Sequence, residues 1–363
     1  MQREKFGSRL GFILISAGCA IGLGNVYRFP IWCGAYGGGI FLLFYVLFLL
    51  LLGIPVMTAE LSVGRASRRS IATSFDVLER KGQKWHWMKV LGVFGNYMLM
   101  MFYTTISGWF VVYFCKYLTG SIMVSTTAEQ LGGVFGSIVT NPGLNIGVTA
   151  LVILTCFGVC AMGLEKGVER ITKVMMVMLL VLILGLGIYA CTLPGAGAGF
   201  LFTTLSSIFN NMAGGRIIGT LFFLFMVFAA LSTVIAVFEN IMSFWLEWTK
   251  LRRWQIAIIN VVLLFVLTMP FIFSNVGGFF AEKIFLGRNF GDFEDFLVSN
   301  MALPIGSLVY ILFCTQRFGW GWKNYEAEVN AGAGAKVPAW MRPYMTCVLP
   351  IIIAIIVVLS LAG

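Results

Sequence analysis

GCAIGLGNVYRFP, residues 18–30, places glycines, an amide and an arginine inside an otherwise apolar run. Glycine lowers the cost of leaving the helical conformation, and a proline ends the run, so this stretch predicts a helix broken near its middle. An unwound segment leaves carbonyl groups free on one side and N–H groups free on the other. In membranes such breaks line buried sites, where the carbonyls face cations and the N–H groups face anions. The alternative is a kinked span whose glycines serve helix packing.

The composition predicts an all-α polytopic membrane protein. Hydrophobic residues make up 59% of the 363 residues, charged residues only 11%, and the mean hydropathy is +0.92. A soluble domain of this size carries far more charge. Apolar runs long enough to cross the hydrocarbon core predict nine spans in a single transmembrane domain, residues 1–363. The predicted spans are 11–31, 38–63, 89–118, 145–163, 172–193, 217–245, 254–275, 294–315 and 344–362.

Lysine and arginine are unevenly divided between the two sets of loops, and this predicts the orientation. Nineteen of them lie in one set and three, Arg216, Lys283 and Arg288, in the other. Positively charged loops stay in the cytoplasm, so we expect a cytoplasmic N-terminus and, after nine spans, an outside C-terminus in the plasma membrane. The nineteen lie in loops 1–10, 64–88, 164–173, 246–253 and 316–343.

Several other classes of function are disfavoured. The net charge of +10 is spread over short loops on one side, which does not predict a nucleic-acid surface. The single histidine, His86, stands in a basic loop without a nucleophile and base beside it, so we expect no enzyme. The eight cysteines show no metal-ligand spacing and predict neither disulfides nor zinc: Cys19, Cys33, Cys115, Cys156, Cys160, Cys191, Cys314 and Cys347.

A second polar cluster lies on the predicted span 217–245. Ala229, Ser232 and Thr233 stand at positions i, i+3 and i+4, so one carbonyl and two hydroxyls face a common point. Neutral oxygens of this kind suit a small hard cation without the cost of burying a carboxylate. The alternative is ordinary hydrogen bonding of these hydroxyls to their own helix.

Nearly the whole chain resembles the neurotransmitter:sodium symporter family, whose members have the LeuT-type fold of two inverted five-helix halves. The resemblance rests on these segments: SRLGFILISAGCAIGLGNVYRFP, GGGIFLLFY, GIPVMTAELSVGR, LGVFGNYMLMMFY, ISGW, GLEKGVER, AGGRIIGTLFF, FAALSTVIAVFEN and FEDFLVSN. It implies sodium-coupled symport of a small molecule, an amino acid or related amine, across the lipid bilayer, with a homo-oligomer possible.

The resemblance assigns site residues one by one. The carbonyls of Gly18 and Ile21 would join Ala229, Ser232 and Thr233 in one sodium site. Ala20 and Asn25 match half of the family's other sodium site, which also touches the substrate.

Substrate and gate residues follow in the same way. Tyr103, six residues before Trp109, resembles the tyrosine that meets the substrate carboxylate, and Gly22 and Gly24 resemble its backbone donors. Arg28 and Asp295 resemble the extracellular gate, and two embedded charges are costly unless paired. A further resemblance pairs Arg3 with Glu247 at the cytoplasmic gate.

The chain departs from the family after the fifth predicted span. From residue 194 it passes directly to a segment that resembles the one before the family's eighth helix, which suggests an internal deletion near residues 194–200. The apolar run 200–209 is about half the length that a span needs. The expected fold is therefore a LeuT-type fold reduced to nine helices, without the sixth and seventh.

Two functions of different classes remain open. The chain is either a sodium-coupled symporter with a shortened sequence, or a non-transporting membrane protein that retains one sodium-type site or acts as a binding scaffold. The absent sixth helix normally supplies half of the substrate pocket, so its loss favours the second possibility.

Overall fold

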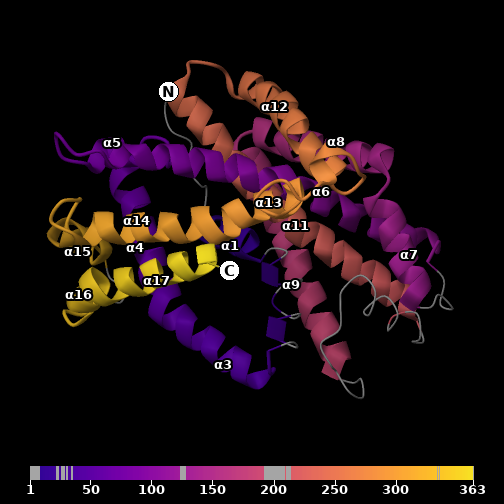
Figure 1. The fold of residues 1–363 in the computed structure, drawn as a ribbon, viewed down its shortest axis with the longest axis horizontal. Helices are drawn as coiled ribbons and strands as arrows, with labels where there is room; N and C mark the ends of the chain where they lie inside the picture. The colour runs from indigo at the N-terminus through magenta and orange to yellow at the C-terminus, as the bar shows by residue number, and fades with distance from the viewer. Residues whose placement is uncertain are drawn as a thin grey trace. The chain divides into compact units, whose positions relative to one another are not determined.

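The computed structural model describes residues 9–21, 24–25, 29, 32–33, 36–122, 128–191, 209, 214–332, 334 and 336–362. Within these ranges the chain is helical and forms no β-sheet (Figure 1). The helices are α1 (Arg9–Ala20), α3 (Gly39–Phe48), α4 (Ile54–Ser67), α5 (Ser74–Leu78), α6 (Met88–Thr119), α7 (Ala128–Val139), α8 (Pro142–Ala161), α9 (Arg170–Cys191), α11 (Gly215–Trp248), α12 (Arg253–Ser274), α13 (Phe290–Phe296), α14 (Leu303–Thr315), α15 (Trp322–Val329), α16 (Met341–Pro343) and α17 (Leu349–Ala362).

Seven helical stretches of the described chain are long and apolar enough to cross a membrane. Several consist of two helices joined by a π-helical turn, as α3 joins α4 through Leu49–Gly53. The seven overlap predicted spans: Gly39–Ser67, Trp85–Thr119, Pro142–Ala161, Gly215–Trp248, Arg253–Ser274, Phe290–Thr315 and Met341–Leu361.

The other two predicted spans, 11–31 and 172–193, contain α1 and α9. Regular α-helix in the first of them ends at Ala20, well before residue 31. The predicted deletion near 194–200 lies outside the described residues.

The chain forms two compact units. Unit 1 comprises Met1–Phe41, Met100–Met242 and Leu251–Gly291, and unit 2 comprises Leu42–Leu99, Ser243–Lys250 and Asp292–Gly363. The long helices α6 and α11 each contribute residues to both units.

Unit 1 is a bundle in which α8 packs on α12 and α1 packs on α9. Aromatic rings connect the longer helices. Tyr113 of α6 stacks on Phe223 of α11 with ring centroids 4.9 Å apart, and Phe157 of α8 stacks on Phe238 of α11. Stacked rings of this kind add about 0.5–1.5 kcal/mol each beyond the burial of their area. The bundle therefore holds α11 against both α6 and α8.

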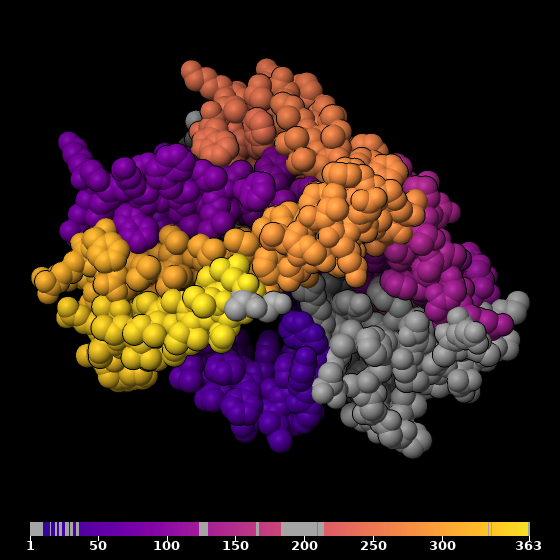
Figure 2. All heavy atoms as spheres, in the orientation of Figure 1, coloured from indigo at the N-terminus to yellow at the C-terminus, as the bar shows by residue number. Residues whose placement is uncertain are grey.

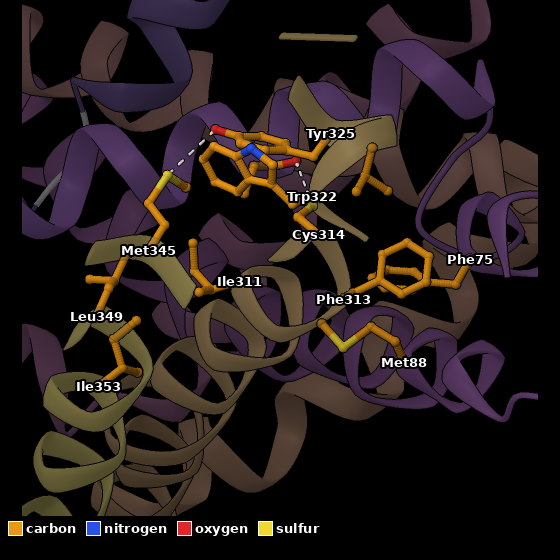
Figure 3. Close-up of a cluster of buried hydrophobic side chains, with 12 residues drawn as sticks. Phe75, Met88, Ile311, Phe313, Cys314, Trp322, Tyr325, Met345, Leu349 and Ile353 are labelled. Carbon is orange, nitrogen blue, oxygen red and sulfur yellow. Dashed lines mark hydrogen bonds between the residues drawn. The ribbon is translucent and has the colours of Figure 1, made fainter. Parts of the chain in front are cut away.

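Unit 2 is built around α4, α14, α15 and α17. In Figure 2 the yellow spheres of α17 lie along the orange spheres of α14. Figure 3 shows the buried side chains that these helices share, with Phe313 against Phe75. The Tyr325 hydroxyl lies 3.0 Å from the Thr58 hydroxyl. Burial of the Tyr325 side chain raises the pKa of its phenol, and the hydrogen bond with Thr58 lowers that pKa by less.

Candidate functional site

Two hydroxyls on α11 point at the carbonyl group where the first helix nears its end. The Ser232 Oγ lies 3.0 Å from the Gly18 carbonyl oxygen, and the Thr233 Oγ1 lies 3.3 Å from it. The same hydroxyls lie 3.0 Å and 3.2 Å from the carbonyl oxygen of Ala229. All four residues are buried. Two carbonyls and two hydroxyls from α1 and α11 therefore converge within unit 1.

Glycine at position 18 leaves room for this close approach. A Cβ atom placed there would lie 2.8 Å from the Met176 sulfur and 3.3 Å from the Ser232 Cβ. The first distance is too short for real atoms, so a side chain at position 18 would displace the Met176 side chain. Ile21, the other residue of this stretch assigned to the site, directly follows α1, and its N–H donates to the Ala17 carbonyl at 2.8 Å.

This group of oxygens carries no formal charge. Hydroxyl and carbonyl oxygens are ligands of hard cations, and a monovalent ion needs less compensating negative charge than a divalent ion. A hydroxyl can also rotate. Its hydrogen points at a carbonyl here and can turn away when its lone pair faces a cation. The donor set thus fits a small monovalent cation.

Asn25 and Ala20 are joined directly. The Asn25 side-chain amide donates to the Ala20 carbonyl oxygen at 2.8 Å, across the point where the regular helix ends. This bond satisfies a carbonyl that has lost its helical partner. Gly24 next to it has open space around its Cα, and Gly22 lies outside the described residues.

Tyr103 and Trp109 lie on α6 and are both buried. The Trp109 indole donates to the Asn145 side-chain oxygen of α8 at 2.7 Å. The Tyr103 carbonyl accepts from the Ser107 hydroxyl one turn later. Tyr103 is thus on the face of α6 that is covered within the protein.

The residues assigned to the gates have partners that the sequence did not suggest. The Glu247 carboxylate accepts from the Ser70 N–H and hydroxyl, each at 2.8 Å, and from the Thr73 hydroxyl. The Asp295 carboxylate accepts from the Ser299 hydroxyl at 2.9 Å. Arg3 and Arg28, the partners expected from the resemblance, lie outside the described residues.

One polar contact near the site has no counterpart in the sequence prediction. Glu169, in the segment GLEKGVER, is buried and lies against Gly11 of α1. The sequence shows Glu169 only as one of several charges in a short segment, and the glycine that it touches lies far away along the chain.

Comparison with known proteins shows what this chain is similar to. The sequence profile of the Sodium:neurotransmitter symporter family matches residues 3–132. An uncharacterized sodium-dependent transporter of Bacillus subtilis is 25% identical, with 85% of this chain and 87% of the relative covered. The sodium-dependent neutral amino acid transporter B(0)AT2 of Rattus norvegicus is 38% identical over 121 residues, 32% of this chain and 15% of the relative.

A relative from Methanocaldococcus jannaschii, an uncharacterized sodium-dependent transporter, is 25% identical over 470 positions, covering 99% of this chain and 91% of the relative. That alignment is longer than the 363 residues of this chain, so the relative contains internal residues without a counterpart here. Among solved structures, the crystal structure of MhsT in complex with L-phenylalanine matches with a TM-score of 0.86 and 28% identity, and 99% of each chain is covered. The all-helical architecture, its LeuT-like fold and these similarities show a multi-pass membrane protein that is similar to the sodium-dependent transporters of the sodium:neurotransmitter symporter family.

Proposed function

We propose that this chain holds the sodium-binding core of a symporter of amino acids or related small amines. The observation that carries the proposal is the convergence of the Ser232 and Thr233 hydroxyls on the Gly18 carbonyl. The carbonyl groups of Ala229 and Ile21 complete the proposed ligand set.

Sodium at this point would bridge α1 and α11. Neutral ligands avoid the several kcal/mol that a buried carboxylate costs, and the ion replaces hydroxyl–carbonyl contacts with ion–oxygen contacts. Binding therefore favours the arrangement in which Gly18 lies beside Ser232. A ligand shifts a conformational equilibrium by its difference in affinity for the two states, which is how sodium would couple to transport.

The substrate assignment rests on α1, α6 and the relatives. Gly22 and Gly24 would donate their N–H groups, and Tyr103 its hydroxyl, to a substrate carboxylate. Ala20 and Asn25 would contribute to a second sodium beside it, and their hydrogen bond supports a shared location. MhsT holds L-phenylalanine and B(0)AT2 is a neutral amino acid transporter, which supports this substrate class.

The orientation and gates complete the proposal. The distribution of positive charge supports a cytoplasmic N-terminus and an outside C-terminus in the plasma membrane. Arg28 with Asp295 would form the outer gate, and Arg3 with Glu247 the inner gate. The Glu247 carboxylate is already fixed by Ser70, which supports a role for it at the cytoplasmic end of α11.

A second candidate function is favoured by one specific observation. The sequence passes from the fifth predicted span to the family's eighth helix without room for two further spans, and the alignment with the Methanocaldococcus jannaschii relative also indicates missing residues. The chain alone would then bind sodium without moving substrate. The two candidates share the sodium site and differ in whether this chain completes a transport cycle.

Sodium-dependent thermal stabilisation tests the sodium site that both candidate functions share. At a sodium concentration about a hundred times its dissociation constant, binding stabilises the folded protein by about 2.7 kcal/mol. We expect the double variant Ser232→Ala, Thr233→Ala to lose that stabilisation. Thr220→Ala is the matched control, because the Thr220 hydroxyl on the same helix donates to the Arg216 carbonyl of its own helix. A double variant that sodium still stabilises as fully as the wild type would disprove the site.

A further inference from the structure

A buried carboxylate lies directly against the first helix. Glu169 ends the π-helical turn Leu164–Glu169 that precedes α9, and only 3% of its surface is exposed. A Cβ atom built on Gly11 would lie 2.0 Å from the Glu169 Oε1 and 2.4 Å from its carboxyl carbon. Any side chain at position 11 would therefore displace this carboxylate. The Lys173 ammonium lies 2.8 Å from the same oxygen and offsets its charge.

A second close approach occurs two turns further along the same pair of helices. There Gly18 of α1 lies against Met176 of α9. The two glycines are seven residues apart, and so are Glu169 and Met176, so α1 and this segment run in the same direction. Seven residues of helix span about 10 Å, which makes the two contacts the ends of one continuous interface.

This interface ends at the proposed sodium ligands. The Gly18 carbonyl that faces Ser232 and Thr233 belongs to the same residue that packs on Met176. Helix α1 packs on α9, and helix association in a membrane depends on such close packing, so this contact sets the position of α1. Any shift of its N-terminal half along or away from α9 moves the Gly18 carbonyl relative to the two hydroxyls.

We propose that Glu169 is a positioning residue that fixes the N-terminal half of α1 and thereby sets the sodium affinity of the site at Gly18. The inference rests on the proposed sodium site. Glycine at position 11 leaves room for the carboxylate, and the Lys173 ammonium compensates the charge of this buried acid. Glu169 does not touch the ion and acts through the position of α1.

The test is a double-variant cycle read as sodium affinity. Gly11→Ala should raise the sodium concentration for half-maximal thermal stabilisation about tenfold, because the added methyl group overlaps the carboxylate. Glu169→Ala should raise it as well, because α1 loses the group that fixes it. In the double variant the methyl group has room, so Gly11→Ala should then add less than a twofold further change.

A matched control is Gly158→Ala on α8, where the added Cβ enters space that the packed part of the described chain leaves open. It should leave the sodium affinity unchanged. Hydrogen exchange in sodium-free protein gives a second readout: amides of 9–20 should exchange faster in Glu169→Ala than in Gly158→Ala. This readout remains available if Gly11→Ala fails to fold.

The outcomes separate the inference from the proposed function. In one outcome the wild type responds to sodium, and Gly11→Ala and Glu169→Ala lower only the stability of the sodium-free protein without changing its sodium affinity. That outcome overturns the inference but not the proposed sodium site. Additive effects in the double variant overturn it too, because contacting residues should be coupled. A wild type without any sodium response overturns both.

Discussion

At the scale of single residues, the Trp109–Asn145 pair shows how a buried polar group is satisfied. The indole of Trp109 donates to the Asn145 Oδ1, while the Asn145 amide donates to the carbonyls of Ile138, Val139 and Asn141. Asn145 is almost fully buried, so water cannot replace a lost partner. The pair therefore fastens α6 to the start of α8.

We expect Trp109→Phe to lower the free energy of unfolding by about 1–3 kcal/mol, because it leaves the Asn145 oxygen buried without a donor. Denaturation in mixed detergent micelles measures this. Trp87→Phe, at a side chain that is 64% exposed, should change the free energy by less than about 0.5 kcal/mol. Equal effects of the two substitutions would show that the hydrogen bond contributes nothing.

Glu294 contrasts with Asn145. It lies on α13, is fully buried, and neither carboxylate oxygen has a hydrogen-bond partner in the part of the chain that the structure describes. An unpaired charge in such a place costs several kcal/mol, and a neutral amide of the same size avoids that cost.

Glu294→Gln should therefore leave the free energy of unfolding unchanged or raise it. Asp295→Ala, beside it, should lower that free energy because it removes the oxygen that accepts from the Ser299 hydroxyl. The same denaturation experiment compares the two variants, and a loss of more than about 1 kcal/mol in Glu294→Gln would show that its charge is used.

At the scale of helices, the π-helical turn Leu164–Glu169 depends on a glycine. A Cβ atom at Gly167 would lie 2.1 Å from the Val159 carbonyl oxygen of α8, which is backbone and cannot rotate away. Gly167→Ala must push the turn off α8. We expect it to cost about 1–3 kcal/mol of unfolding free energy, as overpacking does.

The control substitution should not lower the unfolding free energy. Gly158→Ala adds a methyl group into open space on α8, and alanine has the higher helix propensity, so the unfolding free energy should stay equal or rise by up to about 1 kcal/mol. A tolerated alanine at Gly167 would mean that the turn can move freely.

Helices were the part of this structure that sequence reasoning could anticipate. Apolar length alone indicates where α8 or α12 begins and ends within a few residues, and helical spacing places Ser232 and Thr233 on the face of Ala229. Periodicity within one helix says nothing about which other helix lies opposite. The contact with Gly18 was therefore expected only through the family resemblance, and that of Gly11 with Glu169 was not expected.

At the scale of the whole molecule, this chain lacks internal residues that the Methanocaldococcus jannaschii relative contains, and this bears on whether the proposed sodium site can be coupled to transport. Gly18, Ser232 and Thr233 come from helices that remain, and their contacts lie within one compact unit. The substrate pocket of the family needs its sixth helix. A fold that lacked two helices would have a gap about two helix diameters wide, each about 10 Å, beside the first helix. The polar backbone near Asn25 would be poorly satisfied by lipid in that gap.

We therefore expect the reconstituted chain to be stabilised by sodium and yet to accumulate no amino acid when sodium is higher outside the vesicle. Inserting the missing internal segment of the Methanocaldococcus jannaschii relative near residues 194–200 should restore uptake, because it supplies the absent wall of the pocket. The same insertion carrying Ser232→Ala, Thr233→Ala is the control and should not transport. Concentrative, sodium-dependent uptake by the chain as it stands would contradict this prediction, and a substrate site formed without the sixth helix would then have to exist.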